Sequence, residues 1–247
     1  MVDVSIVVTA YNYDQFINEC LDSCLGQLGT SLNYEVIVVD DGSTDETQTL
    51  LALRSDPRLR VLRIVNSGIE EASNLGFAAS NGRFIVRVDA DDALALTYLA
   101  RIEPMLQLEY GFFYADYSVI DANSVTLEEV RLPEFDITEI MARGDFLATG
   151  TLYRAELLHS IGGYSTQTKN SGLENYELIL NLINSEVQGL HVAESLFHYR
   201  RHRTNMSASR KSSIIEYGRA LFERNELGGF ATNQYHPYKL KLSEELS

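Results

Sequence analysis

Short apolar segments alternate with amphipathic ones over the first 115 of the 247 residues. The apolar segments are rich in Val and Ile, which predicts buried strands at 4–8, 35–39, 60–64 and 84–88. Helical periodicity predicts helices at 14–28, 44–54, 69–80 and 97–108. Strands that are apolar on both faces and separated by helices form mostly parallel sheets covered by helices on both sides. We therefore expect an α/β fold with a Rossmann-like, mostly parallel central sheet.

The alternation weakens beyond residue 112. The pattern there predicts a strand at 112–117, a loop or hairpin at 118–135, and a strand leading into a short helix at 150–160. It further predicts a helix at 175–183, short strands at 190–192 and 196–199, and an amphipathic helix at 212–227. Residues 228–247 carry no clear pattern. We expect three parts, with bounds at 1–115, 116–210 and 211–247, the last being a helix and a tail.

Polar residues follow the predicted parallel strands, at the point where each strand ends. They are found at 9–12, 40–43, 66–68 and 89–92. In open parallel sheets, ligands bind in the crevice beyond the carboxyl ends of the strands. Four strands thus direct polar termini toward one rim, which predicts a binding site there.

The last of these clusters contains three carboxylates, Asp89, Asp91 and Asp92. Carboxylates this close together repel one another unless a cation or hydrogen-bond donors offset the repulsion. Oxygen ligands of this kind suit hard divalent ions such as Mg²⁺ or Mn²⁺, which in turn hold phosphate oxygens. The alternative interpretation is an acidic loop that caps a helix beginning near Leu94.

The net charge of −15 argues against nucleic acid as a partner, because phosphate backbones are held by clustered Lys and Arg. A phosphorylated substrate would need a metal ion or local cationic groups. No signal-peptide pattern or bilayer-length apolar run is apparent. We expect a cytoplasmic protein, and peripheral contact with a membrane surface is compatible with this pattern.

The segment Asp40–Asp45 follows a strand and opens a helix. Gly42 permits a tight turn, and Ser43 or Thr44 can cap the helix. A carboxylate at this strand end can accept hydrogen bonds from a nucleobase or from ribose hydroxyls. By itself the segment is also compatible with a well-capped turn, or with the paired aspartates of a phosphoacceptor receiver domain.

Three segments in this order and spacing carry a family resemblance. They read VSIVVTAYN at 4–12, VVDDGSTD at 38–45 and DADD at 89–92, and NSG at 66–68 with ASNLG at 72–76 lies between them. This combination closely resembles the family 2 glycosyltransferases, which are inverting enzymes of the GT-A fold that use nucleotide-diphosphate sugars. The resemblance is strong over residues 3–110 and looser over 145–207.

The resemblance implies a donor-binding part at 1–115, an acceptor-binding part at 116–210 and a bound Mn²⁺ or Mg²⁺. The metal ligands would be Asp91 and His202, since Tyr199–Ser207 resembles the Tyr-Arg-x-His segment that closes over the diphosphate. The alternative for His202 is membership of a basic surface cluster. The acceptor would be a saccharide or a lipid-linked sugar, and the oligomeric state stays open. Donor contacts would come from Thr9, Ala10, Tyr11, Asn12, Asp41, Asn66, Gly68, Asn74, Asp89 and Ala90.

Two positions depart from the family's pattern. Ser73 stands where the family usually has an Arg that contacts the nucleotide. Asn175 stands where an Asp usually serves as catalytic base, and an amide takes no proton at neutral pH. The adjacent Glu174 is a candidate base, although an acid at a helix start is also favoured by the helix dipole alone.

Other classes stay open at this point. The two departures favour, as the main alternative, a protein that binds nucleotide sugars and has weak or lost transfer. A receiver domain would explain Asp40 and Asp41 but not the cluster at 89–92, and the chain is about twice the usual size for that fold. A dehydrogenase is disfavoured, because no Gly-x-Gly-x-x-Gly follows the first strand.

Overall fold

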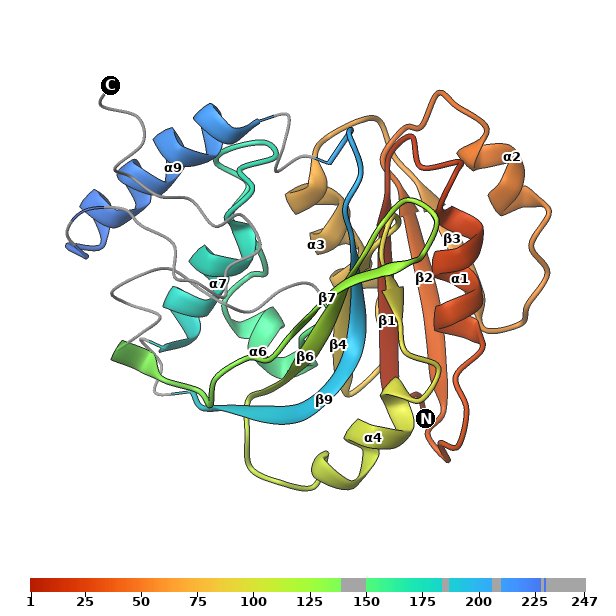
Figure 1. Cartoon of the computed structure of the whole chain (residues 1–247), viewed down its shortest axis with the longest axis horizontal. Coiled ribbons are helices and arrows are strands. Elements are labelled where there is room, and N and C mark those ends of the chain that lie inside the picture. Colours follow the sequence, from red (N-terminus) through yellow and green to blue (C-terminus); the bar gives the residue numbers. More distant parts are fainter. Residues whose placement is uncertain (139–149, 184–186, 206–209, 228, 230–247) are drawn as a thin grey trace.

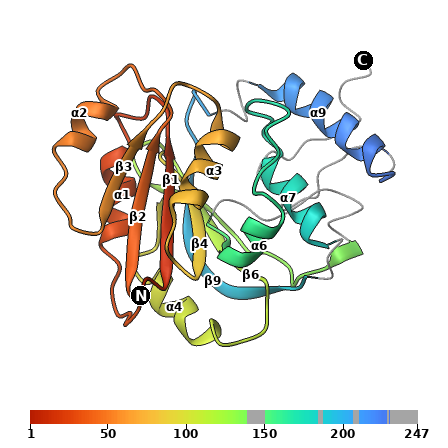
Figure 2. The same cartoon turned by 180° about the vertical axis from the view of Figure 1, so that it is seen from behind.

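The computed structural model describes residues 1–138, 150–183, 187–205, 210–227 and 229. Its first half is a parallel sheet in the order β3–β2–β1–β4. The strands are β1 (Val4–Ala10), β2 (Tyr34–Asp40), β3 (Leu59–Arg63) and β4 (Phe84–Asp89). The helices between them are α1 (Ile17–Leu25), α2 (Thr47–Ala52) and α3 (Ile69–Ala79). Figures 1 and 2 show α1 and α3 on opposite faces of these strands. The predicted parallel sheet with helices on both faces is confirmed for this half.

The second half of the sheet mixes strand directions. It contains β5 (Ala93–Leu94), β6 (Phe112–Ile120), β7 (Thr126–Val130), β8 (Leu152–Arg154) and β9 (Gly189–Arg200). The order continues β4–β8–β6–β9–β5, with β7 paired to the far end of β6 (Figure 1). β8 is antiparallel to both neighbours, whereas β6 and β9 are parallel. β6 and the antiparallel β7 form a hairpin, where the sequence predicted a loop or hairpin at 118–135.

Four details differ from the sequence-based expectation. α2 begins at Thr47 with Glu46 as its N-cap residue and no side-chain cap hydrogen bond, so neither Ser43 nor Thr44 caps it. The short strands predicted at 190–192 and 196–199 are one strand, β9, whose register with β6 shifts on either side of Asp116. Ala93 and Leu94 pair with β9, and the next helix, α4 (Tyr98–Ile102), begins later. The acidic loop therefore leads into a strand and does not cap a helix at Leu94. The predicted helix at 97–108 continues only as a 3₁₀ turn, Glu103–Met105.

The remaining helices are α6 (Ala155–Ser160), α7 (Glu174–Ile183) and α9 (Lys211–Arg224), all close to their predicted positions. Gly162 and Gly163 follow α6 with positive φ angles of 76° and 74°, which glycine adopts without strain. α9 packs on α7, where Tyr176 and Phe222 have ring centroids 5.7 Å apart. The predicted tail at 228 and 230–247 lies outside the described residues.

One hydrophobic core extends from β1 to α9, with fully buried members such as Val7, Phe113, Tyr176 and Phe222. β6 runs across the predicted boundary at residue 115. The division into donor and acceptor parts therefore concerns the two sides of a shared sheet, and it stays a prediction. Within the described ranges, no helix is both long and apolar enough to cross a membrane.

Candidate active site

The carboxyl ends of β1 and β4 meet through Thr9 and Asp89, which are directly paired in the sheet. The Thr9 hydroxyl donates a 3.0 Å hydrogen bond to Oδ1 of Asp89, and the Ala90 amide donates to the Thr9 carbonyl at 3.0 Å. The predicted donor residues Thr9, Asp89 and Ala90 therefore lie together. The sheet fixes their backbones, so the carboxylate of Asp89 is held at the rim.

The end of β2 is tied to the loop after β3 through Asp41. Its two carboxylate oxygens accept hydrogen bonds from the amides of Ser67 at 2.6 Å and Gly68 at 2.9 Å. Asn66 donates to the Asp41 carbonyl at 3.1 Å. Gly68 has a φ of 102°, which favours glycine at this close approach. Three predicted donor residues, Asp41, Asn66 and Gly68, thus form one buried or half-buried corner.

The loop after β1 bends toward the start of α2. Asn12 has a φ of 59°. Its side-chain oxygen accepts a 2.8 Å hydrogen bond from the Thr44 backbone amide, and its backbone amide donates to the Ser43 hydroxyl at 3.0 Å. Ala10 is buried, and its carbonyl accepts from the Asp41 amide. Tyr11 lies next to them in the chain and is 44% exposed.

Asp91 meets the segment that follows β9. Its Oδ2 lies 2.8 Å from Nε2 of His202 and accepts a 3.2 Å hydrogen bond from the Asn205 amide. The Asp91 carbonyl accepts a 2.7 Å hydrogen bond from Nε of Arg200, whose side chain is fully buried. The structure therefore brings together the two predicted metal ligands, Asp91 and His202, across 111 residues of chain.

Two aromatic rings enclose this pair. The His202 ring centroid is 4.8 Å from that of Phe16 and 6.1 Å from that of Tyr13. Burial raises the pKa of Tyr13, and the nearby charges of Asp91, Asp89 and Asp92 raise it further. The Tyr13 phenol thus stays protonated, so it can act as a hydrogen-bond donor beside the carboxylates.

A buried cation joins the rim to the start of α7. The guanidinium of Arg87 donates to Oδ1 of Asp89 from Nε at 3.0 Å and from Nη2 at 2.8 Å, and Nη1 donates to Oε1 of Glu174 at 2.9 Å. Burial by itself would lower the pKa of Arg87, but the charges of Asp89 and Glu174 outweigh it and raise this pKa well above its usual value. Arg87 is therefore a permanent cation between two carboxylates.

Glu174 is only 5% exposed, and its second carboxylate oxygen is unusual. Oε2 is buried and has no hydrogen-bond partner among the described residues. Burial raises the pKa of Glu174, Arg87 lowers it, and the charge of Glu70 raises it further; the net direction is upward. Most buried polar atoms in proteins have a hydrogen-bond partner, so this oxygen stands out among the described residues of the site.

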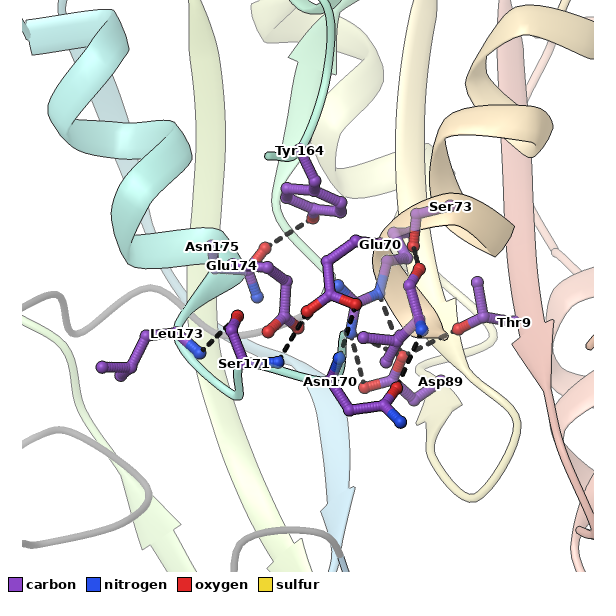
Figure 3. A network of polar contacts seen from close by, with 12 residues as sticks. Thr9, Glu70, Ser73, Asp89, Tyr164, Asn170, Ser171, Leu173, Glu174 and Asn175 are labelled. Carbon is purple, nitrogen blue, oxygen red and sulfur yellow. Dashed lines mark hydrogen bonds and ion pairs between the residues drawn. The ribbon is translucent and has the colours of Figure 1, made fainter. Parts of the chain in front are cut away.

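The loop before α7 is hydrogen-bonded to the start of α3 (Figure 3). Glu70, which is 1% exposed, accepts hydrogen bonds from the amides of Asn170 at 2.8 Å and Ser171 at 2.7 Å. The Asn170 side-chain oxygen accepts from the Ile69 amide at 3.0 Å. This exchange fixes Glu174, the first residue of α7, next to the start of α3.

The other two positions singled out by the sequence are also in contact with this region. Asn175 accepts a 2.6 Å hydrogen bond from the Tyr164 phenol, and Asn74 bonds both the amide and the carbonyl of Tyr164 at 2.8 Å. Ser73 is buried, and its hydroxyl donates to the Ile69 carbonyl at 2.6 Å. The amide of Asn74 is thus occupied in joining α3 to the loop after α6. Its predicted contact with a donor stays a prediction.

The sequence analysis missed Arg87, Tyr164 and Asn205 as site residues. For Arg87 a signal was present, because a charge inside the apolar run at 84–88 must find a buried partner. Tyr164 and Asn205 carry no such signal, because their contacts depend on loops that meet only in the folded chain.

Solved structures share this architecture. The structure titled S. aureus TarS 1-349 in complex with UDP-GlcNAc matches with a TM-score of 0.70 and 20% identity, over 92% of this chain and 67% of that one. Mannosyltransferase PcManGT from Pyrobaculum calidifontis, in complex with GDP-Man and Mn²⁺, matches with a TM-score of 0.66 and 18% identity, over 96% and 67%. These matches show the GT-A fold that the sequence resemblance implied.

The family model described as Glycosyl transferase family 2 matches residues 5–161, which is more than half of the chain. The chain belongs to this family. A relative from Nostoc sp. named as an uncharacterized glycosyltransferase is 26% identical over 94% of this chain and 74% of its own. The succinoglycan biosynthesis protein ExoO of Rhizobium meliloti is 32% identical over 71% of this chain, which spans half of that protein. Glycosyltransferase GlyG of Streptococcus pneumoniae is 32% identical over 64%, and the chain spans 58% of it.

Proposed function

We propose that this protein transfers a sugar from a nucleotide-diphosphate donor to an acceptor hydroxyl. The observation that carries the proposal is the meeting of Asp91 and His202 at 2.8 Å, at the carboxyl edge of the sheet of a family 2 chain. The donor would lie along this edge, with its base near Asp41 and Tyr11 and its ribose or sugar near Asp89. The negative net charge makes nucleic acid an unsuitable partner.

The residues present fit a divalent cation. A carboxylate and an imidazole whose ligating atoms already lie close together suit Mn²⁺, and Mg²⁺ is the other candidate. No group of three or more His, Cys, Asp or Glu side chains in the described ranges could hold a metal by itself. We infer that Asp91 and His202 would share the ion with diphosphate oxygens, where it would offset the charge that develops on the leaving diphosphate.

The base for the reaction would be Glu174. Its unpartnered Oε2 would take the proton of the acceptor hydroxyl, whose oxygen bonds to the anomeric carbon as the carbon–oxygen bond to the diphosphate breaks. The nucleoside diphosphate then departs with that electron pair. Attack from the face opposite the leaving group would invert the anomeric centre.

The acceptor would be a saccharide or a lipid-linked sugar, and the setting polysaccharide or glycolipid assembly. This proposal is supported by relatives whose names refer to such polymers: ExoO, the chondroitin synthase of Pasteurella multocida and the hyaluronan synthase of Pasteurella multocida. A location in the cytoplasm, with peripheral contact to a membrane, agrees with a lipid-linked acceptor.

A second candidate function is nucleotide-sugar binding with weak or lost transfer. It is favoured by Asn175, which offers no base, and by the burial of Glu174 against Arg87. A thermal-stability screen of nucleotide sugars, with and without Mn²⁺, tests what both candidates share, because a ligand that binds only the folded chain raises its stability. We expect at least one nucleotide sugar to stabilise the protein, and only with Mn²⁺. Absence of any such stabilisation would contradict both candidates. Release of nucleoside diphosphate from a stabilising donor would favour the transferase over the binding protein.

A further inference from the structure

The two halves of the site are linked through one side chain. Arg87 lies in the middle of the apolar strand β4, and its side chain is 4% exposed. Its Nε and Nη2 donate hydrogen bonds to Asp89, two residues further along the same strand. Its Nη1 reaches Glu174, 87 residues away at the start of α7. The face of the guanidinium lies 5.3 Å from the ring centroid of Tyr164.

Burial of the Arg87 guanidinium together with two carboxylates is energetically costly. Taking a guanidinium and two carboxylates out of water carries a desolvation penalty that their attraction repays only with good geometry. Here Asp89 receives a fork of hydrogen bonds from Arg87, whereas Glu174 receives one bond from it, and Oε2 of Glu174 has no partner among the described residues. The geometry therefore fixes the direction of the Glu174 carboxylate but leaves one of its oxygens for another group.

We propose that Arg87 is a positioning residue, which holds the Glu174 carboxylate at a set place and in its ionised form relative to Asp89. This inference deepens the proposed function, since it rests on Glu174 as the base. Arg87 acts through Glu174 and Asp89 and needs no contact with the reacting atoms.

Among the described residues, the charged and titratable groups that act on Glu174 are Arg87 and Asp89 on β4, Glu70 on α3, and Tyr164 on the loop after α6. Arg87 is the one cation in this described set, and the carboxylates of Asp89 and Glu70 both oppose ionisation of Glu174. Loss of the Arg87 charge must therefore make Glu174 harder to ionise.

The test compares Arg87→Met and Arg87→Lys with the wild type and with Arg83→Met, a control in which an exposed Arg that pairs with Asp3 is lost. The titration of Glu174 is followed by carboxyl ¹³C NMR, with its signal assigned by its absence in Glu174→Gln.

We expect the Glu174 pKa to rise by about one to three units in Arg87→Met, the usual effect of an opposite charge at this range. It stays unchanged in Arg83→Met. If Arg87→Met does not fold, Arg87→Lys decides through kcat, since an ammonium keeps the charge but lacks the planar fork that bonds Asp89 and Glu174 in a fixed geometry.

The kinetic arm measures release of UDP from UDP-GlcNAc and of GDP from GDP-mannose with Mn²⁺. We expect Arg87→Lys to lower kcat about 10²-fold with donor KM little changed, as for a misplaced catalytic group. An unaltered Glu174 titration together with an unaltered kcat overturns the role of Arg87 while leaving the proposed function intact. If the wild type turns over neither donor, the proposed function loses support for these donors, and the titration alone still decides whether Arg87 controls Glu174.

Discussion

The phenol of Tyr164 donates a 2.6 Å hydrogen bond to the side-chain oxygen of Asn175. Burial, opposed by the nearby Arg87, raises the pKa of Tyr164, so this group stays a donor at neutral pH. The contact fixes the orientation of the Asn175 amide, with its oxygen toward Tyr164 and its nitrogen turned away. The position at which the sequence resemblance implies a carboxylate base is therefore occupied by a group that is already oriented but takes no proton.

Asn175→Asp should be tolerated and should raise turnover. The new carboxylate keeps one oxygen on the Tyr164 phenol and presents the other where the amide nitrogen was, so it adds a base of nearly the same shape. Steady-state release of nucleoside diphosphate measures the effect, with Asn175→Ala as the control that loses the Tyr164 contact. Turnover that falls equally in both variants would show that the amide itself is required.

Glu174→Gln should reduce kcat by about 10²–10⁴-fold, the usual contribution of a positioned base, with donor affinity nearly unchanged. In the wild type, kcat should fall as the pH drops through the Glu174 pKa, because only the ionised carboxylate accepts a proton. Burial raises that pKa, so the acid limb should lie above the ordinary range of a glutamate. The pH profile of Glu174→Gln should lack this limb. Full activity in the variant would exclude Glu174 as the base.

Asp41→Ala should weaken the binding of a nucleoside diphosphate by about 1–3 kcal/mol, the typical cost of losing a hydrogen bond to a charged group. The structure adds a second reason, since this carboxylate also holds the amides of Ser67 and Gly68 in place. Isothermal titration with UDP and GDP checks the change, and Asp56→Ala, outside the site, is the control. Equal affinities in wild type and Asp41→Ala would remove Asp41 from the donor site.

Gly76→Ala should destabilise the fold by about 1–3 kcal/mol, as overpacking does in a filled core. A Cβ at position 76 would overlap the side chain of Val7, on the strand that α3 covers. The gain in helix propensity, about 1 kcal/mol, is too small to offset this overlap. Urea denaturation measures the change, Val7→Ala in the same chain should recover part of it, and the exposed Leu75→Ala should have little effect. A more stable Gly76→Ala would show that α3 moves freely on β1.

Much of the first half of the sheet, with the polar residues at its carboxyl edge, could be predicted from the sequence, because its order is local. Strand periodicity and the polar residues after each strand place Thr9, Asp41 and Asp89 on one edge without knowledge of any long-range contact. The meeting of Asp91 with His202 followed only from the family resemblance, since periodicity does not bring residues 111 positions apart together.

The second half of the sheet was harder to predict for a physical reason. β9 pairs with β6 through shifts in register, and such irregular pairing leaves gaps in the alternation that made one strand look like two. Arg87 lies within an apolar strand, while its partner Glu174 lies on a helix whose place depends on the loop that Glu70 holds. Side-chain networks that cross from one half of the sheet to the other depend on tertiary packing, which no local pattern encodes.

The donor site is tested most directly by titrating wild-type protein, Asp91→Asn and the surface control Asp22→Asn with UDP, GDP, ADP, CDP and dTDP, with and without Mn²⁺. Asp91 offers its Oδ2 beside His202, whereas Asp22 makes only an exposed ion pair with Arg54. We expect at least one diphosphate to bind the wild type and Asp22→Asn only when Mn²⁺ is present, and Asp91→Asn to lose this binding while remaining folded. Unchanged Mn²⁺-dependent affinity in Asp91→Asn, or a wild type that binds none of the five, would contradict the site described here.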